Sequence, residues 1–288
     1  MRVLMLGNSL TIAHGLPEHL AELLSAEVVV HARGGARLAE QLNPKTKLGT
    51  RTTEALAEEH WDYVILQEMS NGPVTHRARF LESAAGLCQL VREHGATPVL
   101  YATWPYAEGS AKLEALGLSF AQMREGLYAA YHEAAEANHA LVADVGEAFC
   151  TSDETHALWA RDGVHPTHAG TRLAAQVLAQ TIQADWKRRV PILVTCGTGS
   201  ICSTIVMARL KEHCRDLGLI DRVSFSCCAA CDIAEHVEGK AFVVAVVELP
   251  PDLGVPVVSG STLLYRADAD ALERFDAQLA VSLRGSIR

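Results

Sequence analysis

The chain has 288 residues, of which 49 % are hydrophobic, and its formal net charge is −9 at pH 7. This length suits about two domains. The negative charge argues against a nucleic-acid partner, and no apolar run approaches the roughly 20 residues of a membrane span, so we expect no direct membrane insertion. Because an apolar strand begins directly after Met1 and leaves no room for a signal peptide, we expect a soluble, cytoplasmic protein.

The first eleven residues predict the element around which the chain is organised. The apolar run 3–6 leads straight into Gly7-Asn8-Ser9-Leu10. A short apolar run that ends at a glycine is typical of a buried parallel strand, and ligands bind beyond the carboxyl ends of such strands. Ser9 is therefore a candidate nucleophile on a sharp turn. A serine at this place also suits the cap of the following helix.

Segments of strand length then alternate with segments of helical periodicity. This alternation predicts an α/β fold in which a parallel sheet carries helices on both faces. The predicted strands are 27–31, 62–66, 98–103 and 140–145, and the predicted helices are 16–24, 52–60, 77–94, 118–138 and 168–186.

Polar motifs follow several of these strands at the same predicted edge of the sheet. A glycine turn spans 32–36, and Gln67-Glu68-Met69-Ser70-Asn71-Gly72 follows the third strand. Asp162 and His165 stand three apart in a loop before the last helix of this part. That spacing lets the carboxylate accept the Nδ1 proton, which leaves Nε2 as a general base for a hydroxyl. A turn with a surface histidine would also explain this loop alone, but the motifs together favour a reaction site.

These motifs give residues 1–186 a resemblance to the SGNH (GDSL-like) hydrolases. Gly7-Asn8-Ser9-Leu10 resembles the nucleophile block of that family, with Asn8 where Asp is commoner. Asp162-Gly163-Val164-His165-Pro166 resembles the last block closely. The resemblance implies a flavodoxin-like three-layer α/β/α sandwich. It also implies that Ser9 attacks an ester, His165 is the base and Asp162 orients the imidazole.

The same resemblance implies an oxyanion hole. Its donors would be the N–H of Ser9, the N–H of Gly35 or alternatively Gly34, and one side-chain amide. The third block departs from the Gly-x-Asn-Asp of the family, so Asn71 is our choice for the side-chain donor and Gln67 the alternative. If neither reaches the oxyanion, turnover would fall by roughly 10²–10³.

The chain changes character near residue 190, after a short polar joint at 185–189. Six of the eight cysteines follow within 36 residues, which indicates reactive thiol chemistry or metal binding in one region. Because no His-x-His or paired Cys-x-x-Cys accompanies them, and small thiols also pack as apolar side chains, we expect neither a metal nor a cofactor. The six are Cys196, Cys202, Cys214, Cys227, Cys228 and Cys231.

A second strand–glycine loop–helix unit begins at residue 190. The strand 190–195 runs into Cys196-Gly197-Thr198-Gly199-Ser200-Ile201-Cys202-Ser203-Thr204, and the helix that follows is expected to bury Ile205, Leu210 and Leu217. Backbone N–H groups and small hydroxyls around one thiol favour an anion and lower the pKa of the thiol. They indicate a thiolate that takes up a phosphoryl group. Further strands are expected at 223–227, 241–247 and 254–260, and a helix at 269–283.

We compared the loop after Cys196 with three known kinds of phosphate-binding loop. A tyrosine phosphatase needs Cys-x5-Arg, whereas the sixth residue after Cys196 is Cys202, and a nucleotide P-loop needs a lysine that is absent. The loop resembles the phosphocysteine loop of phosphotransferase-system IIB components of the galactitol/lactose type, over about residues 190–284. This resemblance implies that Cys196 takes phosphate from a IIA protein and passes it to a sugar held by a membrane IIC protein. The implied phosphate-binding residues are Gly197, Thr198, Gly199, Ser200 and Ser203.

Taken together, the sequence predicts two α/β domains, 1–186 and 190–288. We expect a serine ester hydrolase, with an acylated carbohydrate as its small ester substrate, fused to a smaller parallel α/β domain of IIB type. Two alternatives stay open. One is a phosphoryl-relay protein whose hydrolase half is a scaffold, and the other is a biosynthetic enzyme that uses Cys196 as an acyl or redox thiol.

Overall fold

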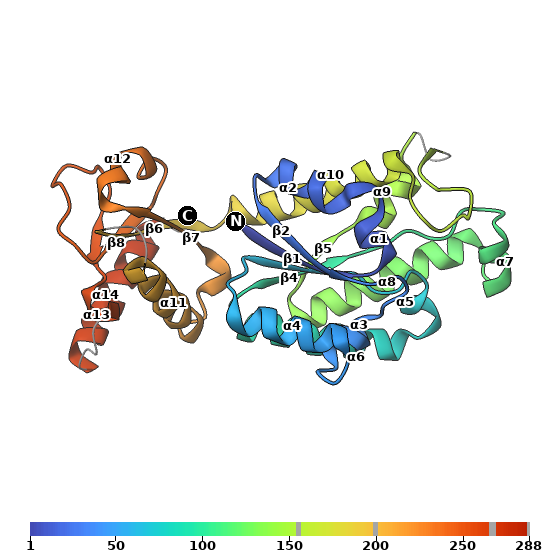
Figure 1. The fold of residues 1–288 in the computed structure, drawn as a ribbon, viewed down its shortest axis with the longest axis horizontal. Helices are drawn as coiled ribbons and strands as arrows, with labels where there is room; N and C mark the ends of the chain where they lie inside the picture. The colour runs from blue at the N-terminus through green and yellow to red at the C-terminus, as the bar shows by residue number, and fades with distance from the viewer. Residues whose placement is uncertain (154–156, 198–200, 265–268, 287–288) are drawn as a thin grey trace. The chain divides into compact units, whose positions relative to one another are not determined.

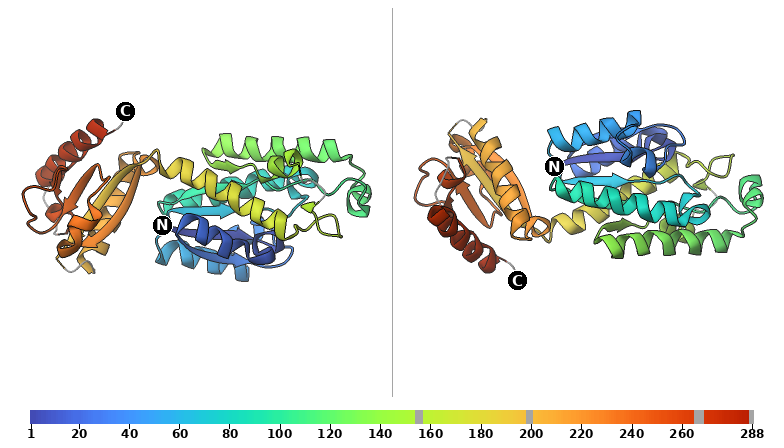
Figure 2. Two further views of the ribbon diagram at one scale, coloured as in Figure 1. Left: turned by 90° about the horizontal axis from the view of Figure 1, so that it is seen from above. Right: turned by 90° about the horizontal axis from the view of Figure 1, so that it is seen from below.

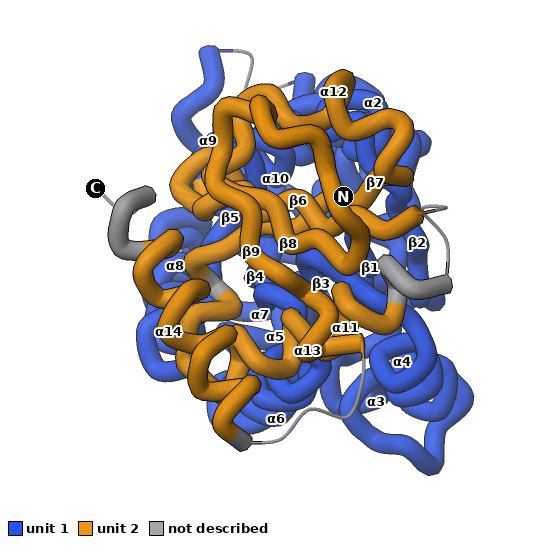
Figure 3. Tube along the Cα trace, turned by 90° about the vertical axis from the view of Figure 1, so that its left-hand side faces the viewer, with its two compact units in different colours: residues 1–184 blue, residues 185–288 orange. Residues whose placement is uncertain are grey.

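The computed structural model describes residues 1–153, 157–197, 201–264 and 269–286. The chain forms two compact units, residues 1–184 and residues 185–288 (Figure 3). Each unit has its own sheet and its own hydrophobic core.

Unit 1 is built on a five-stranded sheet in the order β2-β1-β3-β4-β5. All four pairings are parallel. The register sets Leu6 of β1 opposite His31 of β2 and opposite Leu66 of β3, so the loops after these three strands leave the sheet at one edge. The strands are β1 (Arg2–Gly7), β2 (Glu27–Ala32), β3 (Tyr63–Leu66), β4 (Thr97–Tyr101) and β5 (Leu141–Ala143).

Helices cover both faces of this sheet. In Figures 1 and 2, α2 and α10 lie over one face, whereas α4, α6 and α8 lie over the other. None of the described helices in either unit is both long and apolar enough to cross a membrane. The helices of unit 1 are α1 (Ser9–Ile12), η1 (Ala13–Gly15), α2 (Leu16–Leu24), α3 (Leu38–Leu42), α4 (Lys47–Glu58), α5 (Gly72–Thr75), α6 (Arg77–Glu93), α7 (Ala111–Leu116), α8 (Phe120–Asn138), α9 (Val145–Thr151) and α10 (His168–Trp186).

The apolar runs of the sequence become strands because both faces of the sheet are covered. Leu4 and Leu6 join the core that β1 shares with α6 and α8, where Tyr131 packs edge-on against Phe80. Met5, between the two leucines, is also fully buried. Successive residues of a strand point to opposite faces, so a doubly covered strand is apolar throughout rather than alternating. The predicted α/β fold with a parallel sheet is confirmed.

Local capping explains where the structure differs from the predicted elements. The expected helix 118–138 is confirmed as the single helix α8, which begins at Phe120 because Ser119 forms a capping box with Gln122. The short helix α7 before it was not expected, and Gly117 in the left-handed region ends it. Helix α4 begins at Lys47, five residues before the predicted start. There the Thr46 side chain accepts a hydrogen bond from the N–H of Gly49.

Unit 2 is a smaller version of the same architecture. Its four strands are all parallel and lie in the order β7-β6-β8-β9. Helices α11 and α14 share one core with the sheet, and α12 packs on the other face (Figure 1). The elements are β6 (Val190–Cys196), α11 (Ile201–Asp216), η3 (Ile220–Arg222), β7 (Val223–Ala229), η4 (Ala230–Asp232), α12 (Ile233–His236), β8 (Phe242–Ala245), β9 (Val257–Ser259), α13 (Ser261–Leu264) and α14 (Ala269–Ser286).

The expected apolar face of α11 is partly wrong. Val206, Leu210 and Cys214 are fully buried, whereas Ile205 and Leu217 are exposed. Residues at i, i+4 and i+8 lie in one row along a helix, and this row faces the sheet. Leu217 lies beyond the end of the helix at Asp216.

An aromatic cluster gives the fold a test. Phe149 stacks on Trp104 with ring centroids 3.9 Å apart and contacts Trp159 edge-on. Phe149→Ala should lower the free energy of unfolding by about 3–5 kcal/mol, because it leaves a cavity between two indoles. Leu23→Ala, at a position 44 % exposed on α2, should change it by less than about 0.5 kcal/mol. Urea denaturation measures both, and equal effects would contradict the packing described.

Candidate active site

The turn that carries Ser9 is fixed by its immediate neighbours. Asn8 precedes α1, and its Oδ1 accepts a hydrogen bond from the N–H of Leu10 at 3.1 Å. Ser9 is the first residue of α1 and lies two residues beyond the end of β1 at Gly7. A Cβ at Gly7 would lie 2.0 Å from Oγ1 of Thr11, so only glycine fits between the strand and the short helix. The sequence therefore forces a tight strand-to-helix turn with the serine at its tip.

The loop that carries His165 is shaped by Asp162. One carboxylate oxygen, Oδ1, accepts hydrogen bonds from the N–H groups of Val164 and His165, each at 3.0 Å. Gly163 has φ +71°, and a Cβ there would lie 2.5 Å from Cβ of Ser110. The Asp-Gly-x-His order is thus needed for the turn itself as well as for the two polar side chains.

Backbone and indole contacts hold this loop against the loop that follows β4. Trp104 Nε1 donates to the carbonyl of Val164 at 2.9 Å, and the N–H of Ala107 donates to the carbonyl of Gly163 at 2.8 Å. Directly after the loop, the Thr167 hydroxyl accepts from the N–H of Gly170 and caps the first turn of α10. The imidazole of His165 is therefore presented from a loop with little freedom.

The structure brings Ser9, His165 and Asp162 together in one chain of contacts. Ser9 Oγ lies 2.9 Å from His165 Nε2, and His165 Nδ1 lies 2.5 Å from Asp162 Oδ2. An ionised carboxylate can only accept, so Nδ1 carries the proton, and Nε2 presents its lone pair to the serine hydroxyl. The side chains of His165 and Asp162 are 43 % and 47 % exposed, so a substrate can reach the imidazole.

The carboxyl group of Asp162 is ionised across the ordinary pH range. Partial burial raises its pKa. The hydrogen bond with His165 and the two backbone N–H bonds lower the pKa by more than burial raises it, so that it is about 2. This hydrogen bonding favours the charged form that the imidazole needs as an acceptor.

The three neighbouring strand ends are tied together behind Ser9. Asn8 Nδ2 donates to the carbonyl of Ala36, in the loop after β2, at 3.1 Å and to the carbonyl of Glu68, after β3, at 3.4 Å. The Glu68 carboxyl in turn accepts from the N–H groups of Leu38 and Met69. Burial raises the pKa of Glu68, and these two N–H bonds oppose that shift. Glu68 thus joins the second loop to the third.

The expected oxyanion donors lie at this same edge. Gly35 has φ +70° and open space around its Cα, and Asn71 stands immediately before α5 with its Oδ1 buried and unpaired among the described residues. Within the described chain, no hydrogen bond joins Gly35 or the Asn71 side chain to Ser9 or His165. The Gln67 amide points into the nucleophile turn instead, where Oε1 accepts from the N–H of Asn8. The sequence analysis missed this use of Gln67 and the part played by Glu68.

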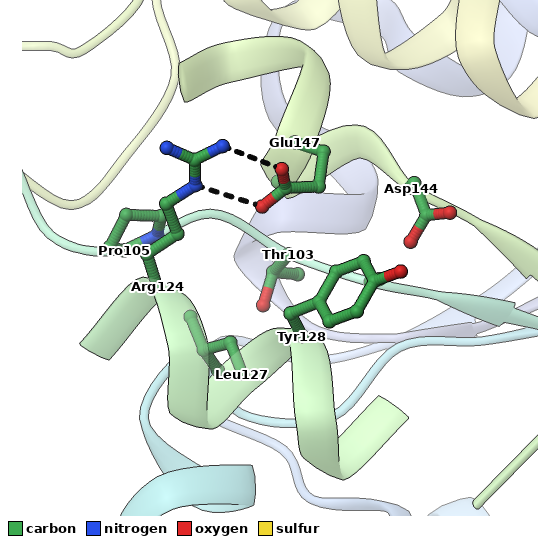
Figure 4. Close-up of a pocket in the computed structure, with 9 residues that line it drawn as sticks. Thr103, Pro105, Arg124, Leu127, Tyr128, Asp144 and Glu147 are labelled. Atoms are coloured by element: carbon green, nitrogen blue, oxygen red, sulfur yellow. Dashed lines mark hydrogen bonds and ion pairs between the residues drawn. The ribbon is translucent and has the colours of Figure 1, made fainter. Parts of the chain in front are cut away.

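A separate crevice lies at the carboxyl ends of β4 and β5. Figure 4 shows Arg124 and Glu147 joined by two hydrogen bonds, with Asp144 and Tyr128 nearby. Its interior of about 10 Å³ takes about one water molecule. The charges of Arg124 and Glu147 neutralise one another, and the space between the lining residues is too small for an ester molecule.

In unit 2, Cys196 ends β6 and is buried, and Gly197 follows it on the surface. Three predicted phosphate-binding residues, Thr198, Gly199 and Ser200, lie outside the described residues, and Ser203 falls within α11.

The other cysteines of this unit differ in exposure. Cys227 and Cys231 are exposed and Cys228 is buried, beside Thr195, whose hydroxyl donates to the Cys228 carbonyl. Among the described residues, no three His, Cys, Asp or Glu side chains group as metal ligands would.

Comparison with known proteins identifies the first unit. A family profile described as "GDSL-like Lipase/Acylhydrolase family" matches residues 5–173, more than half of the chain. The chain belongs to the GDSL-like lipase/acylhydrolase family. The expectation of an SGNH-type ester hydrolase is confirmed at the level of the family.

Solved structures agree with this GDSL-like assignment. A "putative SGNH hydrolase from Slackia heliotrinireducens" is 54 % identical, with a TM-score of 0.62, over 63 % of this chain and 98 % of its own. The acetyl xylan esterase AlAXEase is 14 % identical, with a TM-score of 0.50, over 63 % of this chain and all of its own, and it shares the fold.

A further relative belongs to a different class of protein, the phosphotransferase-system components. The "Putative phosphotransferase enzyme IIB component SgcB" of Escherichia coli (strain K12) is 32 % identical over 83 residues, which are 29 % of this chain and 88 % of that protein. The expected resemblance to a IIB component is therefore confirmed.

The low pKa of Asp162 makes a prediction about stability. An ionised Asp162 stabilises the fold above the unfolded pKa of about 3.9, and this contribution is lost as the pH falls through about 2. Asp162→Asn should therefore unfold more easily than the wild type at pH 5, and the difference should shrink towards pH 2. Urea unfolding of both proteins between these pH values tests this. A difference that stays constant over the range would show that the carboxylate charge plays no part.

Proposed function

We propose that unit 1 hydrolyses esters by acyl transfer through Ser9. The single observation that carries the proposal is the unbroken contact from Ser9 Oγ to His165 Nε2 and from His165 Nδ1 to Asp162. A hydroxyl with a base at hydrogen-bond distance, and a carboxylate that orients the base, is the arrangement that nucleophilic acyl transfer requires.

The steps follow from these three groups. Ser9 Oγ attacks the acyl carbonyl carbon while its proton passes to His165 Nε2, and Asp162 stabilises the imidazolium that forms. The tetrahedral intermediate then expels the alcohol, which takes the proton from Nε2 and leaves the acyl group on Ser9. Water, deprotonated by the same imidazole, attacks the acyl-enzyme, and the acid departs as Oγ regains its proton.

The negative oxygen of each tetrahedral intermediate needs hydrogen-bond donors. We assign the N–H groups of Ser9 and Gly35 and the side-chain amide of Asn71 to this role. Supporting this, the loop of Gly35 is bound to Asn8 through Ala36, and the space beside Gly35 is open. Such donors are worth about 10²–10³ in turnover when one is lost.

As substrate class we propose acyl esters of carbohydrates, with O-acetyl esters first. The support is the association in one chain of an ester hydrolase with a sequence related to a sugar-system component. An acetyl group is small, and the sugar would supply the alcohol.

The proposal predicts that Ser9→Ala abolishes the release of acid from an aryl acetate, because no other hydroxyl lies against the imidazole in the described site. Asp162→Asn should lower kcat by about 10²–10⁴, because the imidazole loses its fixed tautomer. Ser25→Ala, at an exposed serine after α2, is the matched control. Spectrophotometric assay of the four proteins measures this, and Ser9→Ala with wild-type turnover would refute the mechanism.

We propose, as a second function, that unit 2 carries a phosphoryl group on Cys196. The support is the likeness to a IIB component, which we assign to this unit, and the position of Cys196 at the end of β6 before a sixteen-residue helix. A IIA protein would be the phosphoryl donor and a IIC protein with its sugar the acceptor. The alternatives are a relay with a non-catalytic hydrolase scaffold and a reactive acyl or redox thiol.

Mass spectrometry distinguishes these possibilities. Incubation with phosphorylated IIA proteins should add about 80 Da to the wild type and to Cys231→Ser, the mass of one phosphoryl group. Cys196→Ser should stay unmodified by a cysteine-linked phosphate. An acyl or disulfide adduct on Cys196 would instead support the reactive-thiol alternative, and no adduct with any of several IIA donors would count against the relay.

A further inference from the structure

The side chain of Gln67 is fully buried directly behind the nucleophile turn. Its Oε1 accepts hydrogen bonds from the backbone N–H of Asn8 at 2.9 Å and from the Thr11 hydroxyl at 2.9 Å. Its Nε2 donates to the carbonyl of Glu68. The two donors to Oε1 stand on either side of Ser9, one residue before it and two residues after it.

The orientation of this amide is fixed by its partners. A backbone N–H can only donate, so the oxygen of Gln67 and not its nitrogen must face Asn8. A reversed amide would set its NH₂ group against the N–H of Asn8 in a buried site, and a buried donor without an acceptor is costly. The amide of Gln67 also packs closely against the backbone of Gly7. A Cβ added at Gly7 would lie only 2.7 Å from the same Oε1, so only glycine leaves space for the amide.

We infer that Gln67 is a positioning residue for Ser9. Its Oε1 clamps both ends of the turn, so that Oγ already faces His165 Nε2 before an ester binds. Because the side chain has no exposed surface, a substrate oxyanion does not reach its Nε2, and Gln67 is not an oxyanion donor. The inference rests on the acyl transfer proposed above.

The expected consequence concerns turnover more than substrate affinity. The contact between Oγ and Nε2 is used as the proton moves, whereas an ester also binds through surfaces that Gln67 does not touch. A shift of the nucleophile by about 1 Å can cost about 10²-fold in rate. Loss of the clamp should therefore lower kcat and leave KM nearly unchanged.

Two substitutions at this position separate the acceptor from the donor. Gln67→Met keeps the length of the side chain without an acceptor, so kcat should fall about 10²-fold with KM within about threefold. Gln67→Glu keeps an acceptor oxygen, and at mildly acidic pH burial holds its carboxyl protonated, so that its O–H replaces Nε2–H as donor to Glu68. At that pH its kcat should exceed that of Gln67→Met by at least about fivefold. Gln89→Met, at an exposed glutamine of α6, is the control.

Several outcomes would overturn the inference. A Gln67→Met protein with kcat within threefold of the wild type would show that no clamp is needed. A Gln67→Glu protein that is no faster than Gln67→Met at mildly acidic pH would show that an acceptor oxygen at this position does not restore the position of Ser9.

A third substitution keeps the test open if Gln67→Met does not fold. Thr11→Val removes one of the two donors to Oε1 and keeps the shape of the side chain, so kcat should fall at least about threefold, whereas Thr50→Val on the surface of α4 should not lower it. Equal kcat values for the two valine variants would overturn the inference.

Labelling of Ser9 separates this inference from the function on which it rests. An organophosphate should label the wild type at Ser9 and should not label Ser9→Ala. No labelling and no ester hydrolysis by the wild type would overturn both proposals. A wild type that is labelled and active, beside a Gln67→Met protein of equal kcat, would overturn the positioning role alone.

Discussion

The candidate site depends on how closely the ends of β1 and β3 approach each other. At Gly7, an added Cβ would overlap the hydroxyl of Thr11 and crowd the amide of Gln67. Parallel pairing of Leu6 with Leu66 brings the third loop to this point, and the missing side chain lets it close on the first. The nucleophile turn is thus held by the side chain of Gln67, which directly follows β3 and lies 59 residues from Asn8 in the chain, as well as by the Asn8 cap of the short helix.

Different contacts position His165 beside this turn. His165 comes from a loop that is fixed by its own carboxylate, by a glycine in the left-handed region and by the indole of Trp104. Aromatic stacking of Trp104 on Phe149 fixes that indole in turn. The hydrophobic core and the polar contact at Ser9 are therefore linked, because packing errors below the loop would move the imidazole that the serine must meet.

Local sequence was sufficient for some features and insufficient for others. The individual strands, the glycine before the turn at Ser9 and the Asp162–His165 pair are each encoded by residues within a few positions, so spacing predicted them. The buried amide of Gln67 could not be assigned in this way, because its partners depend on which strands pair and in what register. The apolar face of α11 failed for a similar reason, since Ile205 and Val206 are equally apolar and only the packed sheet distinguishes them.

Both candidate reactive residues lie at the carboxyl end of the first strand of their own sheet. In the orders β2-β1-β3 and β7-β6-β8, the chain continues first to one side of that strand and later to the other. Where neighbouring connections leave in opposite directions, a crevice opens at the carboxyl end of the strand between them. Ser9 and Cys196 each stand at such a point: Ser9 two residues after Gly7 ends β1, and Cys196 as the last residue of β6, directly before Gly197. The two proposed chemistries would thus use one topological feature, with the residue at the strand end and the groups that surround it determining which reaction occurs.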